Sequence, residues 1–418
     1  MKFLILSFKR NILPTIFVVI AICLVIFSRS NLEATRNGLE LWAFTVVPSL
    51  FPFFVITNLL SKTNVVNILG KLLDKIMKPL FNVPGIGGFA FVMGLISGYP
   101  VGAKVVSDFR KQQLVTKDEG ERLLAFTNNS GPLFILSSVG ISLFGDTKTG
   151  ILLLCTHILS CITVGIILGK FSKKSDDDFR NKINNRLNTN NTKKKENFKK
   201  QISNNNSSSR ITLNNLGNIL ADSINNSIST IFLIGGFVVI FSVVISMLNT
   251  SHMLDLISNL FKPILQLFNI DLNFAKPLLS GIIELTNGVK QVANIHIKAI
   301  SQNIIICAFL LGFGGFSVLL QVFSIVSKTD LSMKKYCLGK FMQGIFASIY
   351  TFLALKFIPF INLDIVETSS NLTQSISIHS SSILSVFYDV GLATIYIFMI
   401  LALIKLFNKV YKKFTWFY

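Results

Sequence analysis

The chain has 418 residues, of which 51% are hydrophobic and 14% are charged, and its formal net charge is +20. Soluble domains average about 25% charged residues, so this composition argues against a soluble enzyme or a nucleic-acid-binding protein. The basic residues lie between apolar runs, which is how the positive-inside rule distributes them in a polytopic membrane protein. The five cysteines lie mostly in apolar stretches and do not indicate a disulfide framework.

Eight apolar runs are predicted to cross the membrane, because a helical span needs roughly 20 mostly apolar residues. They cover residues 12–27, 41–60, 123–144, 151–169, 228–248, 304–326, 341–360 and 383–407. No small-residue cleavage site follows the first run, which is therefore predicted to be an anchor helix.

Two further apolar runs, 85–97 and 274–283, are too short to cross alone and are predicted to be re-entrant hairpins. Each follows an amphipathic stretch, 65–81 in the first case and 253–270 in the second. These stretches are expected either to lie along the membrane interface or to form the outer arm of a hairpin.

A polar tract rich in Asn, Ser and Lys covers residues 170–210 and is predicted to be a disordered, basic cytoplasmic linker. Spans counted outward from it place the N-terminus and residues 62–78 on the cytoplasmic side as well. The predicted organisation is an N-terminal anchor helix (1–40), a first repeat (41–169), this linker, a second repeat (211–360), and an external loop with a last transmembrane helix and a basic cytoplasmic tail (361–418).

The two halves match in order at a nearly constant spacing. The pairs are Lys78-Pro79 with Lys262-Pro263, Ser97-Gly98 with Ser280-Gly281, Gly131 with Gly315, and Gly102-Ala103-Lys104 with Gly288-Val289-Lys290. The first repeat begins outside and the second inside, so the repeats are inverted, which is typical of secondary transporters. The expected fold is an all-α polytopic membrane protein, with about eight transmembrane helices and two re-entrant hairpins in two inverted repeats.

The tip of the first hairpin carries Tyr99-Pro100 between glycines, which breaks a helix. The helix after Gly102 would direct free N–H groups toward a central cavity, as an anion site requires, with Lys104 in its first turn. The alternative is a tight loop at the cytoplasmic surface with Lys104 in water.

The run Asn128-Asn129-Ser130-Gly131-Pro132 interrupts an otherwise apolar span. Its amides and hydroxyl are expected to face a ligand or the opposite hairpin, because unpartnered polar groups in hydrocarbon are costly. The alternative is that they form polar contacts between helices. The counterpart at 312–316, Gly-Phe-Gly-Gly-Phe, has the same backbone freedom without polar side chains.

Glu284 occupies the second hairpin tip beside Thr286 and Asn287. An intramembrane carboxylate is a candidate site for a coupling proton, a cation or a substrate hydrogen bond. The alternative is a structural ion pair with Lys290 or Lys104.

His157 and Cys161 share one helical face, but two ligands do not make a metal site. The charged stretch 108–122 is expected to be a solvated face. No phosphate-binding loop, nucleophile elbow or paired catalytic carboxylates appear, so the chain is not expected to be an enzyme. The predicted substrate-binding residues are Ser97, Gly98, Tyr99, Gly102, Lys104, Asn128, Asn129, Ser130, Gly131, Glu284, Thr286, Asn287, Lys290, Gly314 and Gly315.

The stretches LISGYPVGAK at 95–104, AFTNNSGPLF at 125–134 and PSLFPF at 48–53 resemble the sporulation integral membrane protein family called YlbJ or SpoVV. The second half resembles it mainly through ELTNG at 284–288. Through its paired Gate, or nucleoside-recognition, domains this family is similar to concentrative nucleoside transporters, which have hairpins and interrupted helices at corresponding places.

This resemblance implies a role in endospore formation, as a secondary transporter of dipicolinic acid across the outer forespore membrane by alternating access. Helix N-termini, Lys104 and the 128–130 side chains would suit the carboxylates of this planar dianion, and Tyr99 could stack on its ring. The alternatives are a nucleoside or nucleobase transporter, for which Glu284 and Asn287 would suit sugar hydroxyls, and a non-transporting sporulation membrane assembly protein.

The expected partners are dipicolinate and the lipid bilayer, without nucleic acid. A homo-oligomer or a complex with other sporulation membrane proteins is left open. No cofactor is expected, and coupling by a proton or by sodium is left open.

Overall fold

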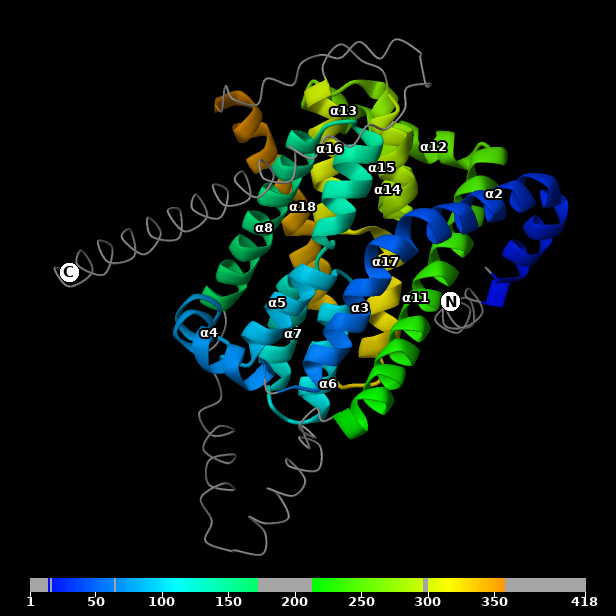
Figure 1. Ribbon diagram of the computed structural model, residues 1–418. Coiled ribbons are helices and arrows are strands. Elements are labelled where there is room, and N and C mark those ends of the chain that lie inside the picture. The colour runs from blue at the N-terminus through cyan, green and yellow to red at the C-terminus, as the bar shows by residue number, and fades with distance from the viewer. Residues whose placement is uncertain (1–13, 16, 64, 172–212, 296–299, 358–418) are drawn as a thin grey trace, which may run out of the picture. The chain divides into compact units, whose positions relative to one another are not determined.

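The structure is a computed structural model that describes residues 14–15, 17–63, 65–171, 213–295 and 300–357, and all regular elements in these ranges are helical (Figure 1). The predicted linker, external loop and basic tail, and the predicted span 383–407, lie outside the described residues. The described chain is that of an all-α integral membrane protein.

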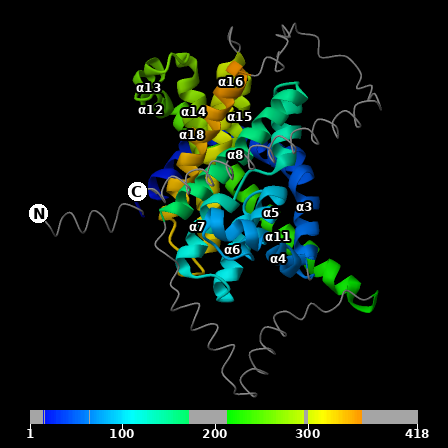
Figure 2. The same cartoon turned by 90° about the vertical axis from the view of Figure 1, so that its left-hand side faces the viewer.

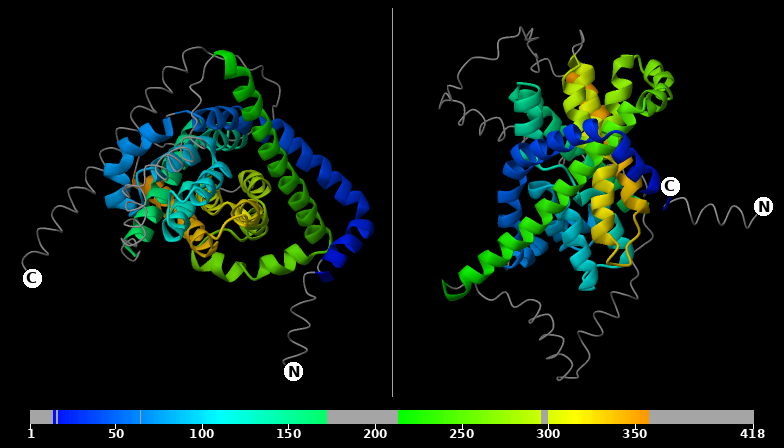
Figure 3. Two further views of the ribbon diagram at one scale, coloured as in Figure 1. Left: turned by 90° about the horizontal axis from the view of Figure 1, so that it is seen from below. Right: turned by 90° about the vertical axis from the view of Figure 1, so that its right-hand side faces the viewer.

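The N-terminal helices lead from the predicted anchor helix into the predicted first repeat, which begins at residue 41. A helix over Phe17–Ile26 meets the helix that starts at Ser28 at an angle of 100°. α2 (Ser28–Leu41) packs along the long helix α11 (Leu213–Thr250) (Figure 3). It continues through a π-helical turn, η1 (Trp42–Val46), into α3 (Val47–Ser61). The Trp42 indole donates a hydrogen bond to the Ile231 carbonyl at 3.0 Å, which ties η1 to α11.

The first repeat contains a hairpin, a broken helix and a full span. Its elements are α4 (Val65–Phe81), α5 (Gly87–Ser97), α6 (Val101–Lys111), α7 (Lys117–Thr127), the π-helix η2 (Phe134–Leu143) and α8 (Thr147–Lys170). α5 and α6 form the first hairpin. α7 and η2 are the two halves of the predicted span 123–144, which breaks at 128–133.

The second repeat has the same order of elements. After α11 come α12 (Met253–Asn259), α13 (Lys262–Leu267), the 3-10 turn η3 (Leu272–Phe274), α14 (Ala275–Ile283), α15 (Leu285–Ala293), α16 (Ile300–Phe313), α17 (Gly315–Val326) and α18 (Lys334–Phe357). α14 and α15 form the second hairpin, and α16 and α17 are the halves of a helix that bends at Gly314.

The two hairpins enter from opposite ends of the bundle. α4 and α6 lie at its lower end in Figure 1, and α12 and α13 lie at its upper end; the perpendicular view agrees (Figure 2). The amphipathic stretches that precede the hairpins are therefore on opposite sides, as the inverted-repeat prediction requires.

Four helices in the described chain are long and apolar enough to cross a membrane: Thr147–Lys170, Asn215–Thr250, Ser301–Val326 and Lys334–Phe357. The bent pair at 17–46 is a fifth if it counts as one span. Three of the eight predicted spans are not among these helices. The span 123–144 is broken at 128–133, and the span 41–60 contains only the short apolar helix Leu50–Leu60. The span 383–407 lies outside the described residues.

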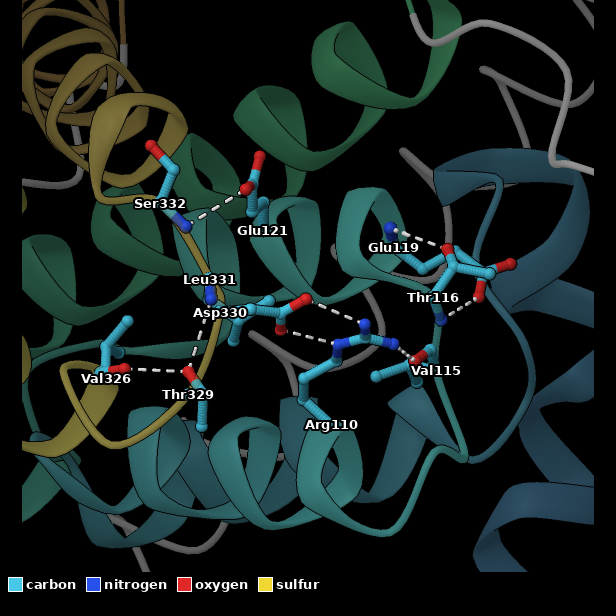
Figure 4. A network of polar contacts seen from close by, with 10 residues as sticks. All are labelled: Arg110, Val115, Thr116, Glu119, Glu121, Val326, Thr329, Asp330, Leu331 and Ser332. Carbon is cyan, nitrogen blue, oxygen red and sulfur yellow. Dashed lines mark hydrogen bonds and ion pairs between the residues drawn. The ribbon is translucent and has the colours of Figure 1, made fainter. Parts of the chain in front are cut away.

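A polar network joins the loop after α6 to the loop after α17 (Figure 4). The Arg110 guanidinium donates two hydrogen bonds of 2.8 Å to the Asp330 carboxylate, and the Ser332 amide donates to Glu121 at 3.0 Å. The guanidinium holds the pKa of Asp330 below its usual range. Arg122 is only 1% exposed, and its guanidinium donates to the Asn82 carbonyl at 2.7 Å within the first repeat. The expectation of a solvated face over 108–122 is therefore partly wrong, because Arg122 is buried and because Arg110 and Glu121 bond across the two repeats.

Candidate functional site

Each hairpin tip packs directly against the broken helix of its own repeat. Gly98 ends α5 with a φ of 76°, and a Cβ added to it would lie 2.7 Å from the Gly131 nitrogen. In the second repeat, Gly315 has a φ of 78°, and a Cβ there would lie 2.9 Å from the Gly281 carbonyl oxygen. At both positions φ lies in the left-handed region, and the backbone of a neighbouring segment is in close contact. Only glycine fits there without strain.

The arms of each hairpin also meet at glycines. A Cβ on Gly94 would lie 3.3 Å from Gly102 Cα, and one on Gly288 would lie 2.0 Å from Gly281 Cα. α14 continues for most of a turn beyond Gly281 before its break at Glu284, whereas Gly98 itself ends α5, so the two tips differ in length.

A cavity of about 30 Å³ lies where the tips and the broken helices come together. Four of the predicted residues line it, namely Tyr99, Gly131, Glu284 and Thr286. Gln321 of α17 also lines it and was not predicted. Its Oε1 is buried and has no hydrogen-bond partner among the described residues, and apolar residues of α3 and α11 complete the wall.

Glu284 caps the second half of its hairpin. Its carboxylate accepts hydrogen bonds from the Thr286 amide (3.1 Å), the Thr286 hydroxyl (3.1 Å) and the Asn287 amide (2.8 Å). Within the described chain it has no lysine or arginine at ion-pair distance, and Lys290 is exposed. The alternative of a structural ion pair with Lys290 or Lys104 is therefore wrong, and the carboxylate occupies the N-terminus of α15 itself.

The polar side chains at 128–130, in the first break (the interruption between α7 and η2), form hydrogen bonds with other helices. Asn128 Nδ2 donates to the Tyr336 hydroxyl of α18 at 2.7 Å. The Ser130 hydroxyl donates to the Leu311 carbonyl of α16 at 3.2 Å, and its amide donates to His157 Nε2 at 3.3 Å. These are the polar contacts between helices that the sequence left as an alternative.

Lys340 and Gln343 of α18 complete this buried polar layer and were not among the predicted site residues. Gln343 Nε2 donates to Asn129 Oδ1 at 2.9 Å. Lys340 Nζ donates to Gln343 Oε1 at 2.6 Å and to Asn129 Oδ1 at 3.5 Å. The available signal was the spacing of Tyr336, Lys340 and Gln343, which puts three polar side chains on one face of a helix.

The remaining predicted residues lie around the cavity without lining it. Ser97 is buried and its hydroxyl bonds to the Thr57 hydroxyl of α3. Lys104 is half-buried in the first turn of α6, a helix that starts without a side-chain cap. Asn287 Nδ2 donates to Ser242 of α11 at 2.9 Å. Across the described ranges, no group of three or more His, Cys, Asp or Glu side chains forms a metal site.

Comparisons with known proteins identify the family of the chain. The family described as "Gate: Nucleoside recognition" matches residues 43–174 and 231–329, one segment in each repeat. The sporulation integral membrane protein YlbJ of Bacillus subtilis (strain 168) is 34% identical over 346 residues, which is 82% of each chain. A solved structure, CNTnw in an inward-facing substrate-bound state, is similar over 81% of this chain and 87% of its own, with 12% identity and a TM-score of 0.46. The chain belongs to the YlbJ family of sporulation integral membrane proteins and carries the nucleoside-recognition Gate repeat.

Proposed function

We propose that this protein is a secondary transporter that moves dipicolinic acid across the outer forespore membrane during endospore formation. The observation that carries the proposal is the cavity between two oppositely inserted hairpin tips and two broken helices. Secondary transporters place their substrate sites between such repeats. The kinship with a sporulation membrane protein supports the cellular setting.

The two hairpins offer different chemistry to a substrate. α6 begins after Pro100 with no side-chain cap. The Val101 and Lys104 amides of its first turn donate to backbone carbonyls. The N–H groups that remain for an anion are those of Gly102 and Ala103. The corresponding N–H groups of α15 are already bonded to Glu284. An aromatic dicarboxylate would place one carboxylate at the N-terminus of α6 and its ring against Tyr99.

The cavity, at about 30 Å³, is far smaller than the ≈300–1,000 Å³ of typical ligand sites. This conformation is therefore closed around its centre, and substrate entry requires the hairpins to separate from the broken helices. The glycine contacts suit such a movement, because they join backbone surfaces without interlocking side chains.

A nucleoside is the second candidate, and a specific observation favours it. Glu284 and the unpartnered Gln321 Oε1 both line the cavity. Two acceptors suit the hydroxyls of an uncharged sugar, whereas Glu284 would repel a dianion.

Counterflow of dipicolinate in proteoliposomes, with uridine as competitor, tests the proposal. The protein should exchange dipicolinate saturably and without competition by uridine. Lys104→Glu should abolish exchange of a dianion, because it reverses the charge beside the N-terminus of α6. The matched control is Lys111→Glu, which changes an exposed lysine at the opposite end of the same helix. Uridine exchange that is insensitive to Lys104→Glu would instead establish the nucleoside function.

A non-transporting assembly role makes a separate prediction. It requires that spores carrying Glu284→Gln or Asn128→Ala have normal dipicolinate contents while the variant protein remains in the membrane. Under the transport proposal, both variants lower the dipicolinate content of spores at normal protein levels.

A further inference from the structure

The most unusual charged group in the described chain is the side chain of Lys340. It is 1% exposed and lies on the face of α18 that packs against α7, α8 and α16. Its ammonium nitrogen contacts two amide oxygens, Gln343 Oε1 at 2.6 Å and Asn129 Oδ1 at 3.5 Å. Within the described ranges, no carboxylate lies at ion-pair distance from it.

The groups around Lys340 do not supply a compensating negative charge. The titratable neighbours are His157 and Cys161 from α8 and Tyr336 from α18 itself. The charged residues of α7 belong to its first turns and bond to other partners, including Lys335 and the Thr116 and Ser332 amides. The amine thus faces side chains that are neutral in their usual forms.

A buried ammonium without a counter-charge is costly, and amide oxygens satisfy its hydrogen bonds without cancelling its charge. Two arrangements avoid this cost. One is the neutral amine, and the other is the ammonium with an anion held nearby. Lysine can adopt either form inside a protein, whereas arginine stays protonated.

The position of Lys340 connects it to the cavity. Asn129, which holds the amine, is two residues before Gly131, which lines the cavity and contacts the first hairpin tip. His157 and Ser130 extend the same hydrogen-bonded layer. A change of charge at Lys340 therefore acts on the segment that has to move when the site opens.

We propose that Lys340 is the proton-coupling residue of this transporter. The amine binds one proton from the aqueous phase when an anionic substrate enters, becoming an ammonium, and returns that proton to water when the substrate leaves. This inference rests on the proposed function, because it requires a substrate that carries a negative charge. A bound anion stabilises the ammonium, and by reciprocity protonation strengthens anion binding, so proton and anion cross together.

The first test reads the protonation of Lys340 without any substrate. NMR of the purified full chain with isotope-labelled lysine should show one side-chain signal that is missing in Lys340→Met and that titrates well below the range of exposed lysines, between about pH 5 and pH 8. A signal that keeps one protonation state throughout that range overturns the proposal, whatever the substrate is.

The second test measures coupling in proteoliposomes. With the interior more alkaline by about one pH unit and the membrane potential held at zero by a potassium ionophore, wild-type protein should accumulate dipicolinate up to about tenfold above its level without the gradient, for one proton per anion. The ionophore is needed because one proton with a dianion carries a net charge of −1. Lys340→Met should give no accumulation above that level. The control is Lys356→Met, which removes an exposed lysine from the same helix and should accumulate like wild type.

Two further measurements distinguish the possible outcomes of the transport test. Lys340→Arg retains a charge that cannot be released and should also lose the response to the gradient, which covers the case in which Lys340→Met does not fold. Undiminished accumulation by either folded variant overturns the proposal. Absence of exchange by wild-type protein at equal pH would instead refute dipicolinate as substrate, and the NMR titration would then decide the role of Lys340 by itself.

Discussion

Replacement of Gly94 by Ala tests the close packing that holds the first hairpin against its broken helix. A Cβ at this position would lie 1.7 Å from the Thr127 carbonyl oxygen and 2.8 Å from its carbonyl carbon, and real Cβ contacts under 3.0 Å essentially never occur. Both atoms belong to the backbone at the end of α7, where no flexible side chain can move aside. α5 and α7 must therefore separate by more than an ångström.

The expected cost follows from two opposing effects. Overpacking of a well-packed interior costs typically about 1–3 kcal/mol, and removal of a glycine from a helix returns roughly 0.5–1 kcal/mol. The difference between these ranges is about 0–2.5 kcal/mol, and the net destabilisation should lie toward its upper end, at about 2 kcal/mol, because the clash is with backbone. Because Thr127 directly precedes Asn128, the same displacement should also disturb the first break and lower substrate exchange.

Thermal unfolding in detergent, followed by size-exclusion chromatography, measures this effect. Gly236→Ala is the matched control, since no atom lies within 4 Å of its added Cβ on the exposed face of α11. That variant should be as stable as wild type or slightly more stable. Equal stability of the Gly94 and Gly236 variants would refute the packing argument.

The remaining predictions concern single polar contacts. Tyr336→Phe should cost about 1–3 kcal/mol of stability, because it leaves the buried Asn128 amide without its partner; Tyr350→Phe, at a partly buried hydroxyl pair with Thr163, should cost less in the same unfolding assay. The contribution of Asp330 to stability should be present at neutral pH and disappear as the pH falls below about 4, because Arg110 lowers the pKa of this carboxyl in the folded state. The difference in unfolding temperature between wild type and Asp330→Asn should therefore be small at pH 7, as for other exposed ion pairs, and vanish in acid; a difference that grows in acid would contradict this. Gln321→Leu should weaken substrate exchange with little loss of stability, since Oε1 has no partner and Nε2 loses only a 3.3 Å bond to the Ser317 hydroxyl one turn away, and unaltered exchange would remove Gln321 from the site.

The breaks in the helices were predictable from sequence because the chemistry that makes them is local. Tyr99-Pro100 between glycines and the polar run at 128–132 cannot continue an α-helix in an apolar span. The inverted order of the repeats followed from the distribution of basic residues, which depends only on the side of the membrane.

The orientation of individual side chains was not predictable, because it depends on which distant helix packs nearby. Asn128 and Asn129 face α18 through Tyr336 and Gln343, partners that are more than 200 residues away. Lys340 stands at the edge of an apolar run and resembles an ordinary flanking lysine. Its burial follows only from the packing of α18 against α7 and α8.

The most direct measurement is an experimental structure of the protein with dipicolinate at a concentration that saturates exchange. The account predicts the ligand between the hairpin tips, in contact with Tyr99 and Gln321 and with a carboxylate at the N-terminus of α6, with the cavity enlarged around it. Dipicolinate bound away from both tips, or a cavity that stays closed under saturating ligand, would contradict the account.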